Sequence, residues 1–220
     1  MSDELSEVWS RLKLAEARIE ALEMRVEQDK VIEDLHRKQA FSYRFVATSD
    51  DYYTWTLQKR AAFLRCEVPQ LCKTVLFENT GKNDLSTEDI SDSKYYFVIV
   101  QYQSKIDVDL LRAMIIKLRG EDNKLAKKHF NFMLAPESIS DKLTGFIHNG
   151  VCPFGLRDQS IPILICKSVL DLSPPVVFVG GGHPQLKLCI STQDLSEAGK
   201  VFSSQISFPR SRLELVESVD

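Results

Sequence analysis

The chain has 220 residues, of which 44% are hydrophobic, and a formal net charge of −3. This size allows one principal domain with an appendage, and the composition is that of an ordinary soluble globular protein. No apolar run approaches the roughly eighteen residues that cross a bilayer, and the acidic first seven residues lack the basic and then apolar character of a signal peptide. We therefore expect a cytoplasmic protein without a membrane segment.

Cysteine and histidine usage gives no sign of a metal site. The five cysteines form no C-x-x-C pair and mostly lie in apolar sequence, where a thiol behaves as a small hydrophobic group; they are Cys66, Cys72, Cys152, Cys166 and Cys189. No Cys or His pair has the spacing of metal ligands. We expect reduced thiols, no metal and no cofactor.

The charge is unevenly divided along the chain. Residues 1–40 hold ten acidic and seven basic side chains, and residues 41–220 hold twenty-one of each sign. Bulk charge therefore does not identify a nucleic-acid partner, and only a local patch could contact phosphates. The best local candidate is the set Arg112, Lys117, Arg119, Lys124, Lys127 and Lys128, for which a solvated helix face and hairpin is an equally good explanation.

Residues 1–40 carry a heptad pattern. Apolar side chains recur at spacings of three and four, at Leu5, Val8, Leu12, Ala15, Ile19, Leu22 and Val26. The pattern predicts a long helix that must bury this seam, because an isolated helix of this kind is marginal in water. We expect residues 5–26 to form a coiled coil with a second copy of the chain or with a partner protein; the alternative is that the helix folds back on its own domain.

Downstream of residue 40 the apolar period becomes that of strands and short helices. Thr56 is expected to cap a helix, and the nearly continuous apolar run 94–102 is typical of a central strand that is buried on both faces. Residues 79–93 are polar and predict a loop. Strands are predicted over residues 41–47, 71–77, 94–102, 130–134, 161–166, 176–179 and 186–190, and helices over residues 57–64, 107–118, 136–143 and 191–199.

Many short strands with interspersed helices and no regular βαβ rhythm predict an α+β fold with a mixed sheet. We divide the chain into a coiled-coil helix at residues 1–40, a globular domain at residues 41–206 and a flexible tail at residues 207–220.

Three segments carry the residues with chemical potential. Lys73 opens an apolar strand with the sequence K-T-V-L, the loop G-V-C-P-F-G-L starts at Gly150, and the turn G-G-G-H starts at Gly180 and precedes L-K-L. In this order, together with L-A-P-E at residues 134–137 and L-T-G at residues 143–145, they resemble the YbaK / prolyl-tRNA synthetase editing-domain family. The likeness covers residues 41–200 and leaves out the first forty.

The resemblance implies a mixed, barrel-like sheet with flanking helices and a hydrolase that acts in trans on mischarged aminoacyl-tRNA. Alanine or cysteine on a proline tRNA are the family precedents, so a tRNA acceptor end is the expected partner. The implied catalytic residues are Lys73, Gly150, Val151 and Cys152. The implied substrate-binding residues are Thr74, Asn149, Pro153, Phe154, Gly155, Gly181, Gly182 and His183.

Hydrolysis of the aminoacyl ester develops negative charge on the carbonyl oxygen, so aimed hydrogen-bond donors matter more than a protein nucleophile. The main-chain N–H groups of residues 150–152 are candidate donors, whereas Pro153 has none to offer. The resemblance implies that Lys73 contacts the terminal phosphate or the ester oxygens and that the ribose 2′-hydroxyl of the tRNA assists water activation. A plain surface lysine at a strand end is the alternative for Lys73.

Two side chains have open roles. His183 is expected to orient a water, contact the substrate amino group or shape the pocket, or else only to cap a tight turn. Cys152 is the rival nucleophile, with His148 or His183 as its base. The sequence lacks the P-loop, G-x-G-x-x-G, G-x-S-x-G and H-E-x-x-H motifs, which excludes the enzyme classes that they mark.

A second reading of the whole chain is a catalytically silent module that holds tRNA ends and uses the coiled coil as a scaffold. In a third reading the helix is the functional part and the globular domain is a stable cap.

Overall fold

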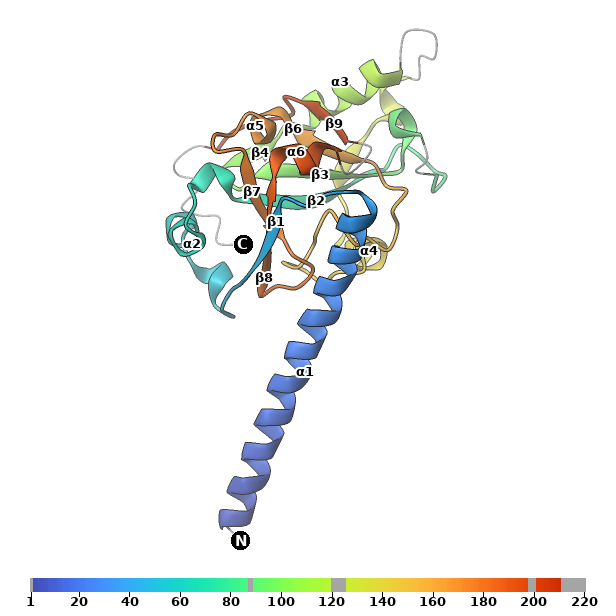
Figure 1. Ribbon diagram of the computed structural model, residues 1–220. Coiled ribbons are helices and arrows are strands. Elements are labelled where there is room, and N and C mark those ends of the chain that lie inside the picture. Colours follow the sequence, from blue (N-terminus) through green and yellow to red (C-terminus); the bar gives the residue numbers. More distant parts are fainter. Residues whose placement is uncertain (1, 87–88, 120–125, 198–200, 211–220) are drawn as a thin grey trace.

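The computed structural model describes residues 2–86, 89–119, 126–197 and 201–210. Figure 1 shows a long N-terminal helix, α1 (Ser2–Arg37), that projects from a globular body in which the strands and the remaining helices are packed together. The predicted helix thus extends almost to Ala40, which is buried. None of the helices in the described ranges combines the length and apolar character that a bilayer span requires.

The body contains a five-stranded mixed sheet in the order β5-β2-β3-β6-β9. Its strands are β5 (Phe132–Leu134), β2 (Cys72–Asn79), β3 (Tyr95–Gln101), β6 (Ile163–Cys166) and β9 (Val201–Ser204). The pairs of β2 with β3 and β5 are antiparallel, and those of β6 with β3 and β9 are parallel. The predicted α+β class with a mixed sheet is confirmed.

A second sheet has three antiparallel strands in the order β1-β8-β7. These are β1 (Tyr43–Ala47), β8 (Leu186–Ser191) and β7 (Val176–Gly180). The two sheets meet where a single parallel bridge joins Leu71, just before β2, to Phe178 of β7. β4 (Ser104–Ile106) and β10 (Ser207–Pro209) form a separate two-stranded ribbon, so the first residues of the predicted tail, residues 207–209, belong to a strand, and residues 211–220 lie outside the described part.

Helices cover the sheets. They are α2 (Leu57–Leu64), α3 (Val108–Arg119), α4 (Glu137–Thr144), α5 (Lys167–Leu170) and α6 (Thr192–Glu197), with short 3-10 turns η1 (Tyr52–Thr54), η2 (Val68–Gln70), η3 (Ile90–Asp92) and η4 (Lys127–His129). The predicted cap is confirmed: the Thr56 hydroxyl accepts a hydrogen bond from the N–H of Lys59 at 3.3 Å.

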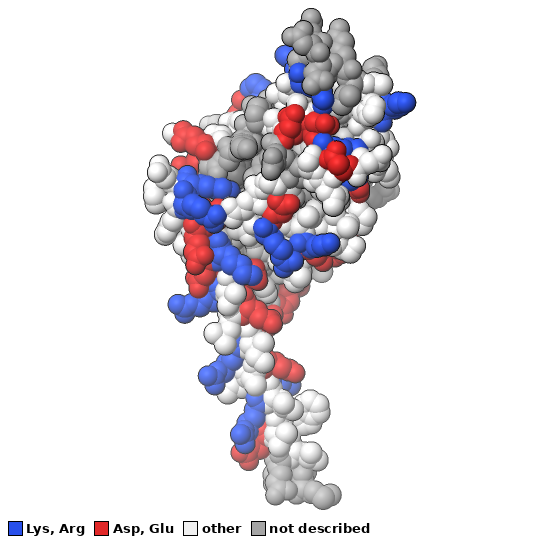
Figure 2. Space-filling model, turned by 90° about the vertical axis from the view of Figure 1, so that its right-hand side faces the viewer, with Lys and Arg blue, Asp and Glu red and all other residues white. Residues whose placement is uncertain are grey.

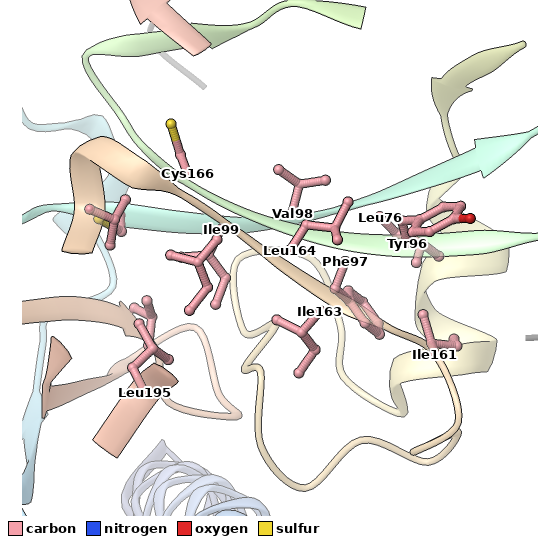
Figure 3. Packing of buried hydrophobic residues seen from close by; sticks show 14 of the residues in the cluster. Leu76, Tyr96, Phe97, Val98, Ile99, Ile161, Ile163, Leu164, Cys166 and Leu195 are labelled. Carbon is pink, nitrogen blue, oxygen red and sulfur yellow. The ribbon is translucent and has the colours of Figure 1, made fainter. Parts of the chain in front are cut away.

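The core is built around β3, which lies between β2 and β6. All seven of its residues are buried, as the unbroken apolar run in the sequence predicts. Figure 3 shows Phe97 and Ile99 on one side of this strand and Val98 on the other. Alternation therefore supplies apolar side chains to both faces of the central sheet.

The last part of α1 is an integral part of this core. Val31 and Leu35 are completely buried in the main hydrophobic cluster, and Asp34 is buried beside them. The carboxylate of Asp34 accepts a hydrogen bond from the N–H of Gly155 at 2.8 Å and pairs with Lys38 at 3.0 Å. The helix thus has an N-terminal exposed part and a C-terminal part that is packed into the domain.

Candidate pocket at the open edge of β2

A pocket of about 340 Å³ lies beside the first half of β2. On that side β5 pairs with residues Phe77, Glu78 and Asn79, and the second sheet is joined to this edge by the isolated bridge at Leu71. The intervening stretch of β2 therefore has an open edge, and β7, β8, α4 and the loop at residues 148–151 close the walls around it. Lining residues include Lys73, Thr74, Asn149 and Val151.

The main chain of Thr74 faces this open edge. The carbonyl of Leu76 accepts a hydrogen bond from Ala135, which directs the polar groups of Leu76 towards β5. Polar main-chain groups alternate in direction along an antiparallel strand, so those of Thr74, two residues earlier, point the same way. The Thr74 side chain is buried, and its hydroxyl has no hydrogen-bond partner within the described part of the chain. This position thus presents polar groups to a ligand.

The ammonium of Lys73 stands at the same place. The side chain is half-buried, and its Nζ lies 5.4 Å from the centre of the Tyr102 ring, which also lines the pocket. A cation over an aromatic face is attracted by the negative charge of the ring face. Lys73 therefore brings positive charge to the wall opposite α4.

A second lysine, Lys187 of β8, lines the pocket and was missed in the sequence-based prediction. It is only 4% exposed, and its Nζ lies 4.3 Å from the centre of the Tyr53 ring and donates a hydrogen bond to the Tyr53 hydroxyl. That hydroxyl in turn donates to the carbonyl oxygen of Asn149 at 2.5 Å. The chain of contacts fixes Asn149, which has the left-handed φ of 65° and immediately precedes Gly150.

Lys187 is buried beside another cation. Arg60 is 3% exposed and donates hydrogen bonds to the carbonyls of Trp55 and Tyr53, and its guanidinium lies over the rings of Tyr53 and Tyr102. Burial, together with a smaller contribution from the positive charge of Arg60, lowers the pKa of the Lys187 ammonium to about 7. A lone lysine within the apolar strand L-K-L-C-I was the available sequence signal, the same signal that marked Lys73.

The depressed pKa predicts a pH-dependent stability. Between pH 7 and the ordinary lysine pKa of 10.5, the unfolded chain binds more protons than the folded one, so raising the pH favours folding. Relative to Lys187→Met, the wild-type free energy of unfolding should rise from pH 7 to pH 9 by on the order of 1 kcal/mol per pH unit. Urea unfolding of both proteins at several pH values measures this difference, with exposed Lys167→Met as the control. Parallel pH curves for wild type and Lys187→Met would contradict the prediction.

The wall formed by α4 carries the opposite charge. Glu137 and Asp141 line the pocket with Ser140, and Nδ1 of His148 lies 3.8 Å from Oε1 of Glu137. One carboxylate oxygen of Asp141 is buried with no hydrogen-bond partner within the described part of the chain. The pocket therefore has a cationic wall, to which Lys73 contributes its charge and Lys187 only in its protonated form, and an acidic wall, which suits a ligand with an ammonium group and developing negative charge.

The sequence model of the aminoacyl-tRNA editing domain matches residues 53–198, which include every residue that lines the pocket. The chain belongs to the aminoacyl-tRNA editing domain family. The match begins at Tyr53 and therefore excludes α1.

Solved structures agree with the fold of this editing domain. One described as a putative trans-editing enzyme for prolyl-tRNA synthetase superposes with a TM-score of 0.64 at 16% identity, covering 83% of this chain and 97% of that one. Another, the hypothetical protein APE2540, gives a TM-score of 0.61 at 19% identity, covering 81% and 99%. At these identities the likeness concerns the fold, and it confirms the predicted editing-domain architecture. A comparison with curated proteins found no match.

Within the editing domain, part of the glycine loop at residues 149–155 lines the pocket, and the rest lies in the protein interior. Asn149 and Val151 line the pocket, but Gly150 does not, and its N–H donates to the carbonyl of Ile147 at 2.9 Å. The predicted donor role of Gly150 is therefore not available in this geometry. Cys152, Pro153 and Phe154 are buried outside the pocket lining.

Gly155, Gly181 and Gly182 support α1 and the loop, whereas Gly180, the first residue of the turn, lines the pocket. The N–H of Gly155 is donated to Asp34. Gly181 donates its N–H to Leu186, and Gly182, at a φ of 99°, donates to Gly150 at 2.9 Å. Nδ1 of His183 accepts a hydrogen bond from the N–H of Gln185 at 3.3 Å, the turn-capping alternative. The substrate-binding roles expected for Pro153, Phe154, Gly155, Gly181, Gly182 and His183 have no counterpart in the pocket lining.

The thiol of Cys152 is poorly suited to nucleophilic attack. The residue is completely buried, and burial raises the pKa of its thiol to about 12. At neutral pH the reactive thiolate is almost absent. Among the described residues, no group of three His, Cys, Asp or Glu side chains could hold a metal ion.

Two residues of the candidate basic patch, Arg112 and Arg119, have acidic partners. Arg112 pairs with Asp109 and donates to the carbonyl of Phe130 at 2.7 Å, and Arg119 lies 3.4 Å from Asp92. Lys124 lies outside the described residues. Figure 2 shows basic and acidic side chains mixed over one face of the molecule, so this face carries no field of a single sign.

Proposed function

We propose that the chain is an aminoacyl-tRNA deacylase that acts in trans in the cytoplasm and hydrolyses the ester between a small amino acid and the terminal adenosine of a mischarged tRNA, with proline tRNA as the first candidate. The observation that carries the proposal is that Lys73 and Val151, which come from separate segments, line the same pocket. Membership of the editing-domain family supports the reaction class.

The cationic wall supplies the electrostatics that the reaction needs. When water adds to the ester carbonyl, negative charge develops on its oxygen, and a donor aimed at that position stabilises the transition state. We assign this role to the ammonium of Lys73 together with the main chain at Val151, with the Thr74 hydroxyl as a further contact. The carbon–oxygen ester bond then breaks, and the ribose oxygen leaves with a proton. The neighbouring ribose 2′-hydroxyl assists the attacking water.

The acidic wall supplies recognition of the amino acid. An aminoacyl ester carries an α-ammonium group, and Glu137 and Asp141 are the carboxylates that line the pocket. A carboxylate in the pocket lining, such as that of Asp141, is suited to accept a charge-assisted hydrogen bond from this ammonium. A volume of about 340 Å³ is near the lower end for ligand pockets and favours a small side chain such as that of alanine or cysteine.

A panel of charged tRNAs tests the function. The purified chain is incubated with alanyl-, cysteinyl- and prolyl-tRNA(Pro), and the remaining radiolabelled ester is measured over time. We expect loss of alanine or cysteine and retention of proline, which is the matched control. Tight binding of tRNA without turnover of any substrate would reject the deacylase and support a module that only holds tRNA ends.

A further inference from the structure

We propose that α1 pairs with the α1 of a second copy of this chain as a parallel, in-register, two-stranded coiled coil over residues 5–26. This inference is independent of the reaction in the pocket. It concerns an apolar surface that the body of the protein leaves uncovered.

The heptad seam is exposed along its whole length. Its large side chains are between 48% exposed, at Leu12, and 62% exposed, at Leu22, and Ala15 between them is exposed too. Figure 1 shows the N-terminal part of α1 extending away from the body. An apolar stripe of this length on a monomer indicates a protein–protein contact.

The alternative that the helix folds its seam onto its own domain does not agree with the geometry. The residues that α1 buries against the body are Val31, Asp34 and Leu35. At 100° per residue, Val31 lies about 180° from Leu22 and about 140° from Val26, on the opposite side of the helix from the seam. The helix thus has one face for the domain and another for a partner, and both can be occupied at once.

The charges beside the seam select a second copy in parallel orientation. With Leu5, Leu12, Ile19 and Val26 at heptad position a, the charged g positions are Glu4, Arg11, Arg18 and Arg25, and the charged e positions are Glu16, Glu23 and Lys30. In a parallel in-register pair, each g residue faces the e′ residue five positions later, which joins Arg11 to Glu16 and Arg18 to Glu23 of the partner helix. The last of these pairs, Arg25 with Lys30, has like charges and lies at the end of the seam. In an antiparallel pair g faces g′ and e faces e′, so arginine would meet arginine and glutamate would meet glutamate.

The core positions and the end of the seam fit the same arrangement. In the second half of the seam, Ile19 and Val26 at a with Leu22 at d is the combination that favours two strands, whereas the first half has Leu5 and Leu12 at a. The next core positions hold Asp29 and Glu33, and Lys30, the following e residue, bonds Glu27 of its own helix at 2.6 Å. The coil therefore ends at Val26, where contacts with the domain take over.

Charge reversal tests the pairing. The wild type should elute with twice the chain mass of 25.1 kDa in light scattering. Arg11→Glu with Arg18→Glu, and separately Glu16→Arg with Glu23→Arg, should each give monomers because all flanking charges then repel. Mixing the two variants should restore a dimer of one chain of each. These exposed substitutions spare the core, so circular dichroism should remain that of the folded domain. A monomeric wild type at every concentration, or dimers in both variants, would overturn the proposal.

Crosslinking tests the orientation. In a parallel pair Leu5 lies opposite Leu5 of the partner helix, so Leu5→Cys should give a disulfide-linked dimer on mild oxidation. Ser10→Cys, at the outward f position, is the matched control and should stay uncrosslinked. Linkage of Ser10→Cys with none of Leu5→Cys would show that the helices do not pair through this seam.

Discussion

Replacement of Lys73 by alanine is expected to lower kcat/KM for deacylation of the preferred mischarged tRNA by about 100-fold or more, the usual effect of losing one donor to a developing oxyanion. The substitution removes a positive charge from the pocket wall but no group from the hydrophobic core, because the side chain is only half-buried and sits beside Tyr102. Single-turnover rates on the charged tRNA panel measure the loss.

Two variants make this result interpretable. Lys167→Ala removes an exposed lysine that contacts Asp171 far from the pocket lining, and its rate should equal that of the wild type. Lys73→Arg keeps the charge but changes its geometry and should recover part of the rate. If Lys73→Ala hydrolyses the ester as fast as the wild type while the wild type is active, the assignment of Lys73 is wrong although the activity stands.

Gly180→Ala is expected to cause the largest loss of stability of any single methyl addition at a glycine near the pocket. A Cβ atom at this position would lie 2.1 Å from the carbonyl oxygen of Val151 and 2.9 Å from its carbonyl carbon. Both are main-chain atoms of the loop that lines the pocket, so β7 and the loop must separate. We expect a loss of about 3 kcal/mol in the free energy of unfolding, at the upper end for overpacking, and a loss of deacylation because Val151 moves.

Gly150→Ala is the matched comparison, because the methyl group that it adds causes a milder steric clash. Its added methyl group would meet its nearest atom, the carbonyl oxygen of Gly182, at 3.1 Å, so a smaller shift relieves the contact. Urea unfolding should therefore rank the wild type first, Gly150→Ala second and Gly180→Ala last. Equal stability of the two variants would mean that the contact between β7 and the loop is looser than the distances imply.

Local sequence patterns identified most of the elements. The capping threonine before α2 and the apolar run of β3 each depend on a few adjacent residues, and both occur as predicted. The missed elements include α5, β4, β9 and β10, which span three or four residues each, too few for a period to be recognised. The strands among them depend on pairing with distant segments: β9 pairs with β6, and β10 pairs with β4.

The site was predicted in part for a similar reason. Lys73 and Val151 belong to motifs that can be recognised in the sequence. Tyr53 and Lys187 are 134 residues apart, and no local pattern predicts that they are in contact. The predicted site included several glycines that do not line the pocket. A glycine permits close approach, but the sequence does not state what approaches: at Gly180 it is the main chain of Val151, and at Gly155 it is the main chain of α1 at Lys30 and Val31.

The contacts of α1 with Gly155 and Gly182 determine the shortest segment of this chain that would keep the domain intact when it is fused to another protein. The carbonyl oxygen of Glu27 and the side chain of Val31 pack against Gly182, and Asp34 accepts a hydrogen bond from Gly155. The helix therefore supports the glycine loop and the glycine turn next to the pocket. A shortened protein that starts at residue 41, or at residue 53 where the family match begins, would lack the last three or so turns of α1 and would expose the surface that they cover. The transferable unit therefore begins near Glu20, because the carboxylate of Glu20 still accepts a hydrogen bond from the side chain of Gln185 at 3.0 Å. The part of the helix that precedes Glu20 can be exchanged without loss of these contacts.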